Sequence, residues 1–275
     1  MDWSLVLASQ GIEAVIEHFP GAQGWVLLVP PTEFDRAVLA IQQYRVENRR
    51  WAWRQHLEWP DVTFHWGVLF WCWALVMVFW LNESVTDHLV TVGSMNGRVP
   101  ETGQWWRLVT AIGLHADVGH LAANLATGLA LLGLAMARFG PGATLLATLL
   151  AGVLGNLAGI YLHPGSYLGL GASGMVMGAL GLLAVQSISV LRQSSRAWRP
   201  VMTGLLGGFF LFILTGLNPA SDVVAHTGGF VAGVVFGAGL GLLPSEFTQR
   251  RGLDRFALAV TLGVVVVAWA LALRR

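Results

Sequence analysis

The chain contains the segment 169-GLGASGMVMGALGLLAVQSISVL-191, a glycine-rich approach followed by a long apolar run. As a helix, a run of this length can cross about 30 Å of hydrocarbon. Further apolar runs bring the number of predicted spans to seven: 63–81, 118–136, 143–162, 173–191, 201–217, 221–243 and 256–273. The sequence therefore predicts an all-α polytopic membrane protein.

The composition agrees with a membrane protein. Of the 275 residues, 55% are hydrophobic and 11% are charged, which is too apolar for an ordinary soluble domain. The formal net charge is +1, so there is no strong basic field and we expect no nucleic-acid partner. Cys72 is the single cysteine, which excludes an intrachain disulfide and a thiolate metal site. We expect the lipid bilayer as the environment and neither a cofactor nor a bound metal.

The first 60 residues differ from the rest of the chain. Gly24–Pro30 has the pattern of a short strand, and Pro31–His56 that of a polar, arginine-rich helix. We interpret residues 1–60 as a small α/β cytosolic domain. Residues 61–245 are then a six-helix core, and residues 246–275 a linker and a seventh transmembrane helix.

Arginine placement predicts the orientation, because the chain has no lysine. Arginines precede the first span and follow the second, fourth and sixth spans, all on one side of the membrane. The positive-inside rule makes that side cytoplasmic, so we expect a cytoplasmic N-terminus. Arg274 and Arg275 break this rule if the seventh run crosses the membrane.

The connection 82–117 is long for a helical bundle and contains Trp105, Trp106 and Arg107. We predict an amphipathic loop lying in the outer interface, with its tryptophans at the level of the lipid headgroups. The alternative is a plain extracellular loop.

Four polar residues stand out within the apolar spans. His120 and Asn124 share one face of the second span, Ser173 opens the fourth, and His226 lies a little way into the sixth. In the predicted orientation all four lie towards the outer face at similar depth. Polar residues within spans are costly unless they are paired, so each is a candidate functional residue.

Ser173 and His226 are the candidate catalytic pair. A serine alone is more often a packing residue, but an imidazole in hydrocarbon needs a hydrogen-bond partner. Glycines line both helices and would let the fourth and sixth spans approach closely, so that hydroxyl and imidazole meet. These glycines are Gly174, Gly178 and Gly181 on the fourth span and Gly229, Gly233, Gly237 and Gly241 on the sixth.

An oxyanion would form during acyl transfer and needs hydrogen-bond donors. The helix N-terminus at Ser173 supplies backbone N–H groups, and His120 and Asn124 supply side-chain donors. Asn124 has the alternative role of an interhelical hydrogen bond that only holds the bundle together. Asp222, four residues before His226, is interpreted as an N-terminal cap rather than a third catalytic residue.

The sequence resembles the rhomboid intramembrane serine proteases over about residues 63–243. The resemblance rests on four motifs in order: Trp106-Arg107, the HxxxxHxxxN set His115, His120 and Asn124, the GASG motif 171–174, and the AHxxG motif 225–229. It implies a nucleophile at Ser173, a general base at His226, an oxyanion hole with His120 and Asn124, and a structural role for His115. It also implies that a span after the six-helix core is an accepted variation.

The resemblance implies an intramembrane serine endopeptidase with a Ser–His dyad and an acyl-enzyme mechanism. We expect it to cleave single-span membrane proteins within or near the outer interface, in the inner membrane of a bacterial cell. Transmembrane protein substrates are its expected partners, and no oligomeric state is predicted. The sequence departs from some members at Met136, in place of an acidic residue, and at Met177, in place of an aromatic ring.

Two other interpretations remain open. Histidines of several spans could coordinate a metal in a transporter, namely His115, His120, His163 and His226. A rhomboid-like protein without catalytic activity could instead bind membrane clients, although such a protein would be expected to lose the serine or the histidine. The chain has no HExxH motif and no aspartate pair within its spans, which disfavours zinc and aspartyl proteases.

Overall fold

The computed structural model describes residues 2–18, 25–48, 63–84, 88–163, 167–186, 188, 198–217, 222–244 and 250–274. The chain divides into two compact units, Met1–Leu57 and Glu58–Arg275. The predicted boundaries at 60/61 and 245/246 lie outside the described residues, and the domain assignment stays a prediction.

The first unit is a β-hairpin with two helices. Strands β1 (Val15–His18) and β2 (Trp25–Leu28) pair antiparallel, and η1 (Pro31–Glu33) leads into helix α2 (Phe34–Glu47). The helix predicted over Pro31–His56 therefore begins as an α-helix at Phe34, and residues 49–56 of the prediction lie outside the described residues. The predicted strand corresponds to β2, whereas β1 and the first helix, α1 (Asp2–Ser9), were not predicted. The core of this unit is formed by Leu7, Ile12 and Ala37.

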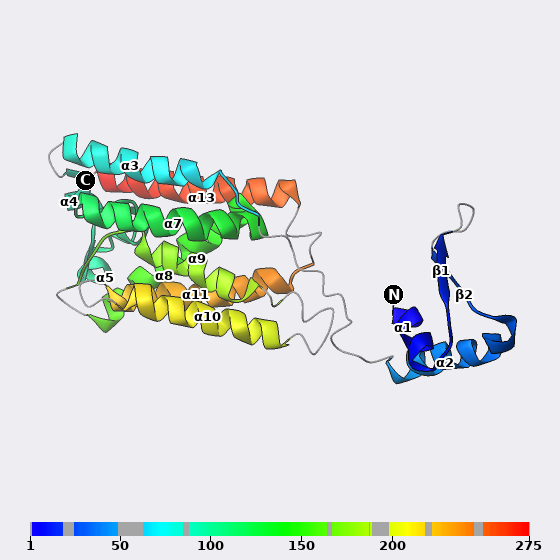
Figure 1. The fold of residues 1–275 in the computed structure, drawn as a ribbon. Coiled ribbons are helices and arrows are strands. Elements are labelled where there is room, and N and C mark those ends of the chain that lie inside the picture. The colour runs from blue at the N-terminus through cyan, green and yellow to red at the C-terminus, as the bar shows by residue number, and fades with distance from the viewer. Residues whose placement is uncertain are drawn as a thin grey trace. The chain divides into compact units, whose positions relative to one another are not determined.

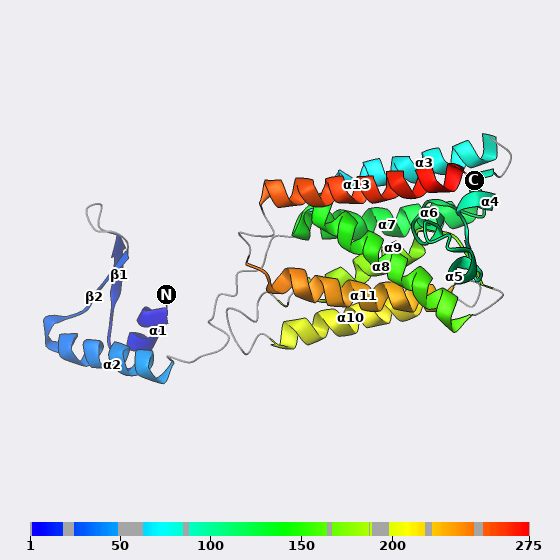
Figure 2. The same cartoon turned by 180° about the vertical axis from the view of Figure 1, so that it is seen from behind.

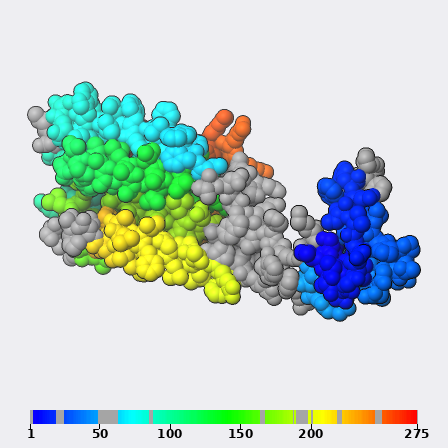
Figure 3. Space-filling view, viewed as in Figure 1, coloured from blue at the N-terminus to red at the C-terminus, as the bar shows by residue number. Residues whose placement is uncertain are grey.

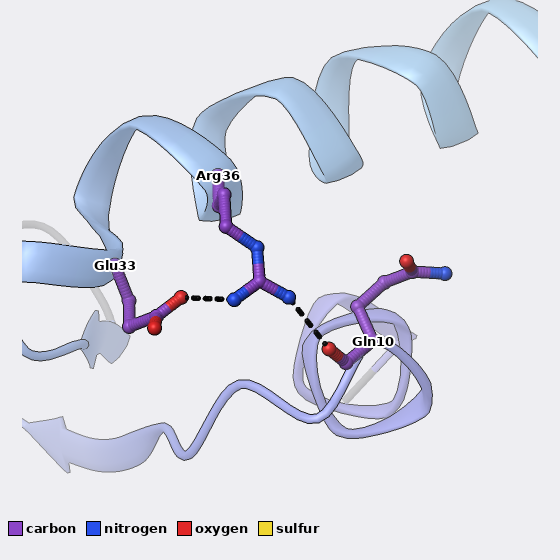
Figure 4. Close-up of polar contacts among 3 residues, drawn as sticks. All are labelled: Gln10, Glu33 and Arg36. Carbon is purple, nitrogen blue, oxygen red and sulfur yellow. Dashed lines mark hydrogen bonds and ion pairs between the residues drawn. The ribbon is translucent and has the colours of Figure 1, made fainter.

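One arginine joins the two helices of the first unit. Arg36, in the first turn of α2, forms an ion pair with Glu33 at 2.6 Å and donates to the backbone carbonyl of Gln10 at 3.1 Å (Figure 4). Gln10 directly follows α1, so the guanidinium holds the end of α1 against the start of α2.

The second unit is a helical bundle (Figures 1 and 2). Among the residues that the structure describes, four helices are long and apolar enough to cross a membrane: α7 (Val118–Phe139), α8 (Pro141–Leu162), α11 (Val223–Leu242) and α13 (Arg251–Leu273). Three further helices carry shorter apolar stretches: α3 (Val68–Ser84), α9 (Ser173–Ala184) and α10 (Trp198–Gly216). A helix is therefore found at each of the seven predicted places, and the prediction of an all-α polytopic membrane protein is confirmed.

Helix α9 lies at the centre of the bundle. It packs against α7, α8, α10 and α11, and almost all of its residues are buried. The α-helix ends at Ala184, earlier than the predicted end of the span at 191; its C-cap residue, Val185, has φ −109 and ψ 9. A helix enclosed by its neighbours does not expose its backbone ends to lipid, so it need not have the full transmembrane length.

The outer helices present apolar side chains to their surroundings. Figure 3 shows α3 in cyan, α7 in green and α10 in yellow along one face of this unit. Large apolar side chains are exposed on α3 and α10, among them Phe70, Trp73, Phe209, Phe210 and Leu214. Such surfaces are compatible with lipid rather than with water.

The connection between α3 and α7 is folded rather than extended. It contains the short helices α4 (His88–Gly93), α5 (Val99–Thr102) and α6 (Arg107–Gly113). Its strand β3 (Met95–Asn96) pairs antiparallel with β4 (Leu168–Gly169), which directly precedes the glycine-rich approach to α9. The connection is thereby tied to the segment that leads to Ser173.

Candidate active site

The polar residues predicted from the sequence lie at one end of the bundle. Helices α7, α9 and α11 all begin at the end that carries α4, α5 and α6 (Figures 1 and 2). Ser173 is the first residue of α9, His226 lies in the first turn of α11, and His120 and Asn124 lie in the first two turns of α7. These four residues therefore lie at the same end of the bundle.

The glycines of α9 and α11 pack backbone against backbone, as predicted. A Cβ added to Gly229 would overlap the carbonyl of Gly174, and one added to Gly233 would overlap the carbonyl of Gly178. Gly174 follows Ser173 directly, and Gly229 lies one turn after His226. The first turns of the two helices, which carry Ser173 and His226, are thus adjacent.

The His226 ring is oriented by the end of α10. Its Nδ1 lies 2.8 Å from the backbone carbonyl oxygen of Gly216, and the side chain is buried. A carbonyl oxygen only accepts hydrogen bonds, so Nδ1 carries the proton and Nε2 keeps the lone pair that a general base needs. Sequence reasoning missed Gly216, because it considered only side chains as partners for the imidazole.

His120 and Asn124 adjoin the loop that leads to Ser173. Gly171 has φ +124 and donates its N–H to the carbonyl of Ala111 at 2.9 Å. A Cβ at this position would lie 2.7 Å from His120 Nε2 and 3.7 Å from Asn124 Nδ2. The imidazoles of His120 and His226 are also close enough to interact electrostatically. The second span therefore contributes its polar face to the same region as α9 and α11.

His115 lies beside His120. The two rings make an edge-to-face contact with centroids 5.2 Å apart, and His115 is only 2% exposed. Burial, and then the charge of His120, lowers the pKa of His115 to about 4, so its ring is neutral at neutral pH. A buried neutral ring packed against His120 suits the structural role implied for His115.

Arg107 organises the folded connection next to the site. Its buried guanidinium donates to the carbonyls of Ser94 at 2.6 Å and Thr91 at 3.2 Å and to the Gln104 side chain at 2.6 Å. Burial lowers the pKa of Arg107, and the three acceptors compensate for the lost hydration. The Trp106-Arg107 motif thus has a structural role here.

The arrangement contains the groups that acyl transfer requires. Ser173 stands at a helix N-terminus, where backbone N–H groups are available to an oxyanion, and His226 presents Nε2 from the neighbouring helix. Fold and site together define the class: a polytopic helical membrane protein with a candidate serine–histidine site at one end of its bundle.

The chain belongs to the rhomboid family. The family model for the Rhomboid domain matches residues 102–242. Rhomboid protease GluP of Bacillus subtilis is 32% identical over 190 residues, which cover 66% of this chain and 36% of GluP. RHOMBOID-like protein 5 of Arabidopsis thaliana is 31% identical over 56% of this chain and 50% of that protein. Rhomboid-type serine protease 2 of Emericella nidulans is 29% identical over 59% of this chain and 32% of that protein. The chain thus spans half or less of the length of these relatives.

Proposed function

We propose that the chain is an intramembrane serine endopeptidase that cleaves single-span membrane proteins within or near the outer membrane interface. The observation that carries the proposal is the close packing of α9 on α11, with Gly174 against Gly229, together with the Nδ1 hydrogen bond of His226. Relatives named as rhomboid proteases and as a rhomboid-type serine protease support it.

The proposed mechanism is a two-step acyl transfer. Ser173 Oγ attacks the scissile carbonyl carbon while its proton passes to His226 Nε2. The oxyanion accepts hydrogen bonds from the N–H groups of the first turn of α9 and from the side chains of His120 and Asn124. His226 then gives the proton to the leaving amine, and a water molecule activated by His226 hydrolyses the acyl-enzyme.

The chemistry of the substrate follows from its environment. The backbone of a transmembrane helix is internally hydrogen-bonded, so its peptide bonds must be unwound before attack. We therefore propose that helix-breaking residues near the scissile bond favour cleavage. The folded connection 88–117 and α10 are candidate gates. Helix α11 packs much less against α10 than against α9.

The proposed location is the inner membrane of a bacterial cell, with the N-terminus in the cytoplasm. The arginines at the end of α7 and at the starts of α10 and α13 support this orientation, because these helix ends lie opposite the candidate site (Figures 1 and 2).

A fluorophosphonate probe tests the proposed nucleophile and base in the full chain purified in detergent. We expect covalent labelling of the wild type and no labelling of Ser173→Ala, because the probe reacts with an activated serine hydroxyl. His226→Ala should slow labelling by at least about 100-fold, since the general base is lost.

Ser84→Ala is the matched control. The Ser84 hydroxyl on α3 donates to the Trp80 carbonyl at 2.8 Å, so its removal should leave labelling at the wild-type level. Equal labelling of wild type, Ser173→Ala and His226→Ala would overturn the assignment. A wild type that is folded but unlabelled would favour the alternative of an inactive protein that binds membrane clients.

A further inference from the structure

Tyr167 lies in the connection between α8 and α9, six residues before Ser173, and its side chain is 6% exposed. Glycines hold the phenol on two sides: a Cβ at Gly159 would lie 2.5 Å from the hydroxyl oxygen, and one at Gly169 would lie 2.6 Å from it. The ring also stacks on His163, with centroids 6.2 Å apart. The hydroxyl is therefore held in one place inside the protein.

Asp222 caps the helix that carries His226. Its Oδ1 accepts from the N–H of Ala225 at 2.9 Å, and its backbone carbonyl accepts from the N–H of His226 at 2.9 Å. The cap uses only one of the two carboxylate oxygens. The other oxygen, Oδ2, is buried.

Helix α8 brings the Tyr167 hydroxyl and Asp222 to the same place: Gly155 packs against the carbonyl of Ala225, whose N–H Asp222 caps, and Gly159, one turn later, packs against the Tyr167 hydroxyl. The Tyr167 hydroxyl oxygen and Asp222 Oδ2 are each a buried polar atom without a hydrogen-bond partner in the described part of the chain. Burial, and then the nearby carboxylate of Asp222, raises the pKa of Tyr167 well above its usual range. The phenol therefore keeps its proton, and of the two groups it is the one that can donate a hydrogen bond.

We propose that Tyr167 and Asp222 form a positioning pair, in which the tyrosine hydroxyl donates to Asp222 Oδ2 and so fixes the separation between Ser173 and His226. Neither residue touches the reacting atoms. The inference rests on the proposed function, because it concerns the geometry of that same site.

Backbone hydrogen bonds fix the segment that joins Tyr167 to Ser173. The Tyr167 carbonyl accepts from the N–H of Gly97 at 2.9 Å, and the N–H of Gly171 donates to Ala111. The segment from Tyr167 to Ser173 is thus anchored to the folded connection at two points. On the other side, Asp222 is the N-cap residue of α11. A hydrogen bond between Tyr167 and Asp222 joins the segment before Ser173 to the start of α11, next to the candidate site.

Three substitutions separate this role from simple capping. Tyr167→Phe removes only the hydroxyl and leaves Oδ2 without its donor. Asp222→Ser keeps a good N-cap acceptor but has no second oxygen for Tyr167. Asp222→Asn keeps both the helix cap and a hydrogen bond with Tyr167, because its amide oxygen caps the helix and its NH₂ group can donate to the Tyr167 hydroxyl.

The experiment measures the rate of fluorophosphonate labelling at Ser173 and the midpoint of thermal unfolding, for the full chain in detergent well below that midpoint. We expect Tyr167→Phe and Asp222→Ser each to slow labelling roughly tenfold, and the double variant to be no slower than either single one. Asp222→Asn should stay within about threefold of the wild type. Tyr161→Phe, an exposed tyrosine on α8, is the matched control and should label like the wild type.

Each other outcome is decisive. If Tyr167→Phe and Asp222→Ser label at the wild-type rate, or if their effects multiply in the double variant, the pair does not exist as proposed. A capping role alone predicts that only the unfolding midpoint changes. If the wild type itself shows no Ser173-dependent labelling, the proposed function fails, and the positioning role fails with it.

Discussion

Gly171 occupies a position that no other residue can take without cost. Its φ of +124 lies in the region that side chains rarely adopt, and its Cα faces the His120 ring. The GASG motif therefore requires a glycine at its first position for two separate reasons, backbone conformation and space for the imidazole.

We predict that Gly171→Ala lowers the rate of Ser173 labelling by roughly 10- to 100-fold, because the new methyl group displaces a proposed oxyanion-hole side chain. Gly103→Ala is the matched control: Gly103 also has positive φ, at +66, but nothing lies within 4 Å of its added Cβ. Gly103→Ala should lower stability by about 1 kcal/mol without changing the labelling rate of folded protein. Equal labelling rates for the two variants would contradict the prediction.

Single residues were predictable where they broke a pattern. Ser173 and His226 stood out because polar groups interrupt apolar runs, and the structure brings their helix turns together. Gly216 and Tyr167 did not stand out. The first contributes a backbone carbonyl, which every residue has, and the second is a loop aromatic that resembles any core residue.

At the scale of elements, the contact between α9 and α11 depends on the absence of side chains. Gly233 faces the carbonyl of Gly178, whereas Gly239 on the same helix has nothing within 4 Å of an added Cβ. We predict that Gly233→Ala destabilises the protein by about 1–3 kcal/mol, because the helices must move apart. Gly239→Ala should be neutral or slightly stabilising, since alanine favours helix. Thermal unfolding in detergent measures both, and equal midpoints would contradict the prediction.

Helix α8 is capped by a residue from α13. The Asp254 carboxylate accepts from the N–H groups of Gly142 at 2.8 Å and Ala143 at 3.1 Å, and a Cβ at Gly142 would overlap the Asp254 backbone carbonyl. The N-cap residue of α8, Gly140, provides no side-chain cap of its own. Asp254 of α13 thus supplies the side-chain acceptor that the N-terminus of α8 lacks.

We predict that Asp254→Ala lowers the free energy of unfolding by about 1–2 kcal/mol, because two N–H groups lose their acceptor. Asp254→Asn retains an oxygen acceptor and should cost less. Thermal unfolding of both variants checks the order, and a midpoint for Asp254→Ala equal to that of the wild type would show that the cap does not contribute.

The helices were predictable because apolar runs of transmembrane length have few other structures available. Their ends were less so: α9 stops at Ala184, and α13 starts at Arg251, five residues before the predicted 256. The short elements between α3 and α7 could not be predicted, since β3 exists only through its pairing with β4, more than 70 residues away in sequence.

At the scale of the whole molecule, each of the two units has its own buried core. Leu7, Ile12 and Ala37 form that of the first, and the clusters around α7, α8 and α9 form that of the second. A unit with its own core can fold by itself. The candidate site is built entirely from residues of the second unit.

We therefore predict that a chain lacking residues 2–57 labels at Ser173 within about twofold of the full chain, as expected for independent parts of a molecule.

Removal of residues 250–275 is the contrasting deletion. It takes away α13, which packs against α4, α6 and α8 and caps α8. Because α8 packs against the first turn of α9 through Gly152, loss of α13 should lower both the unfolding midpoint and the labelling rate. Labelling and unfolding of the two deletions, side by side, test this difference. A loss of labelling greater than tenfold on removal of residues 2–57 would mean that the first unit takes part in forming the site.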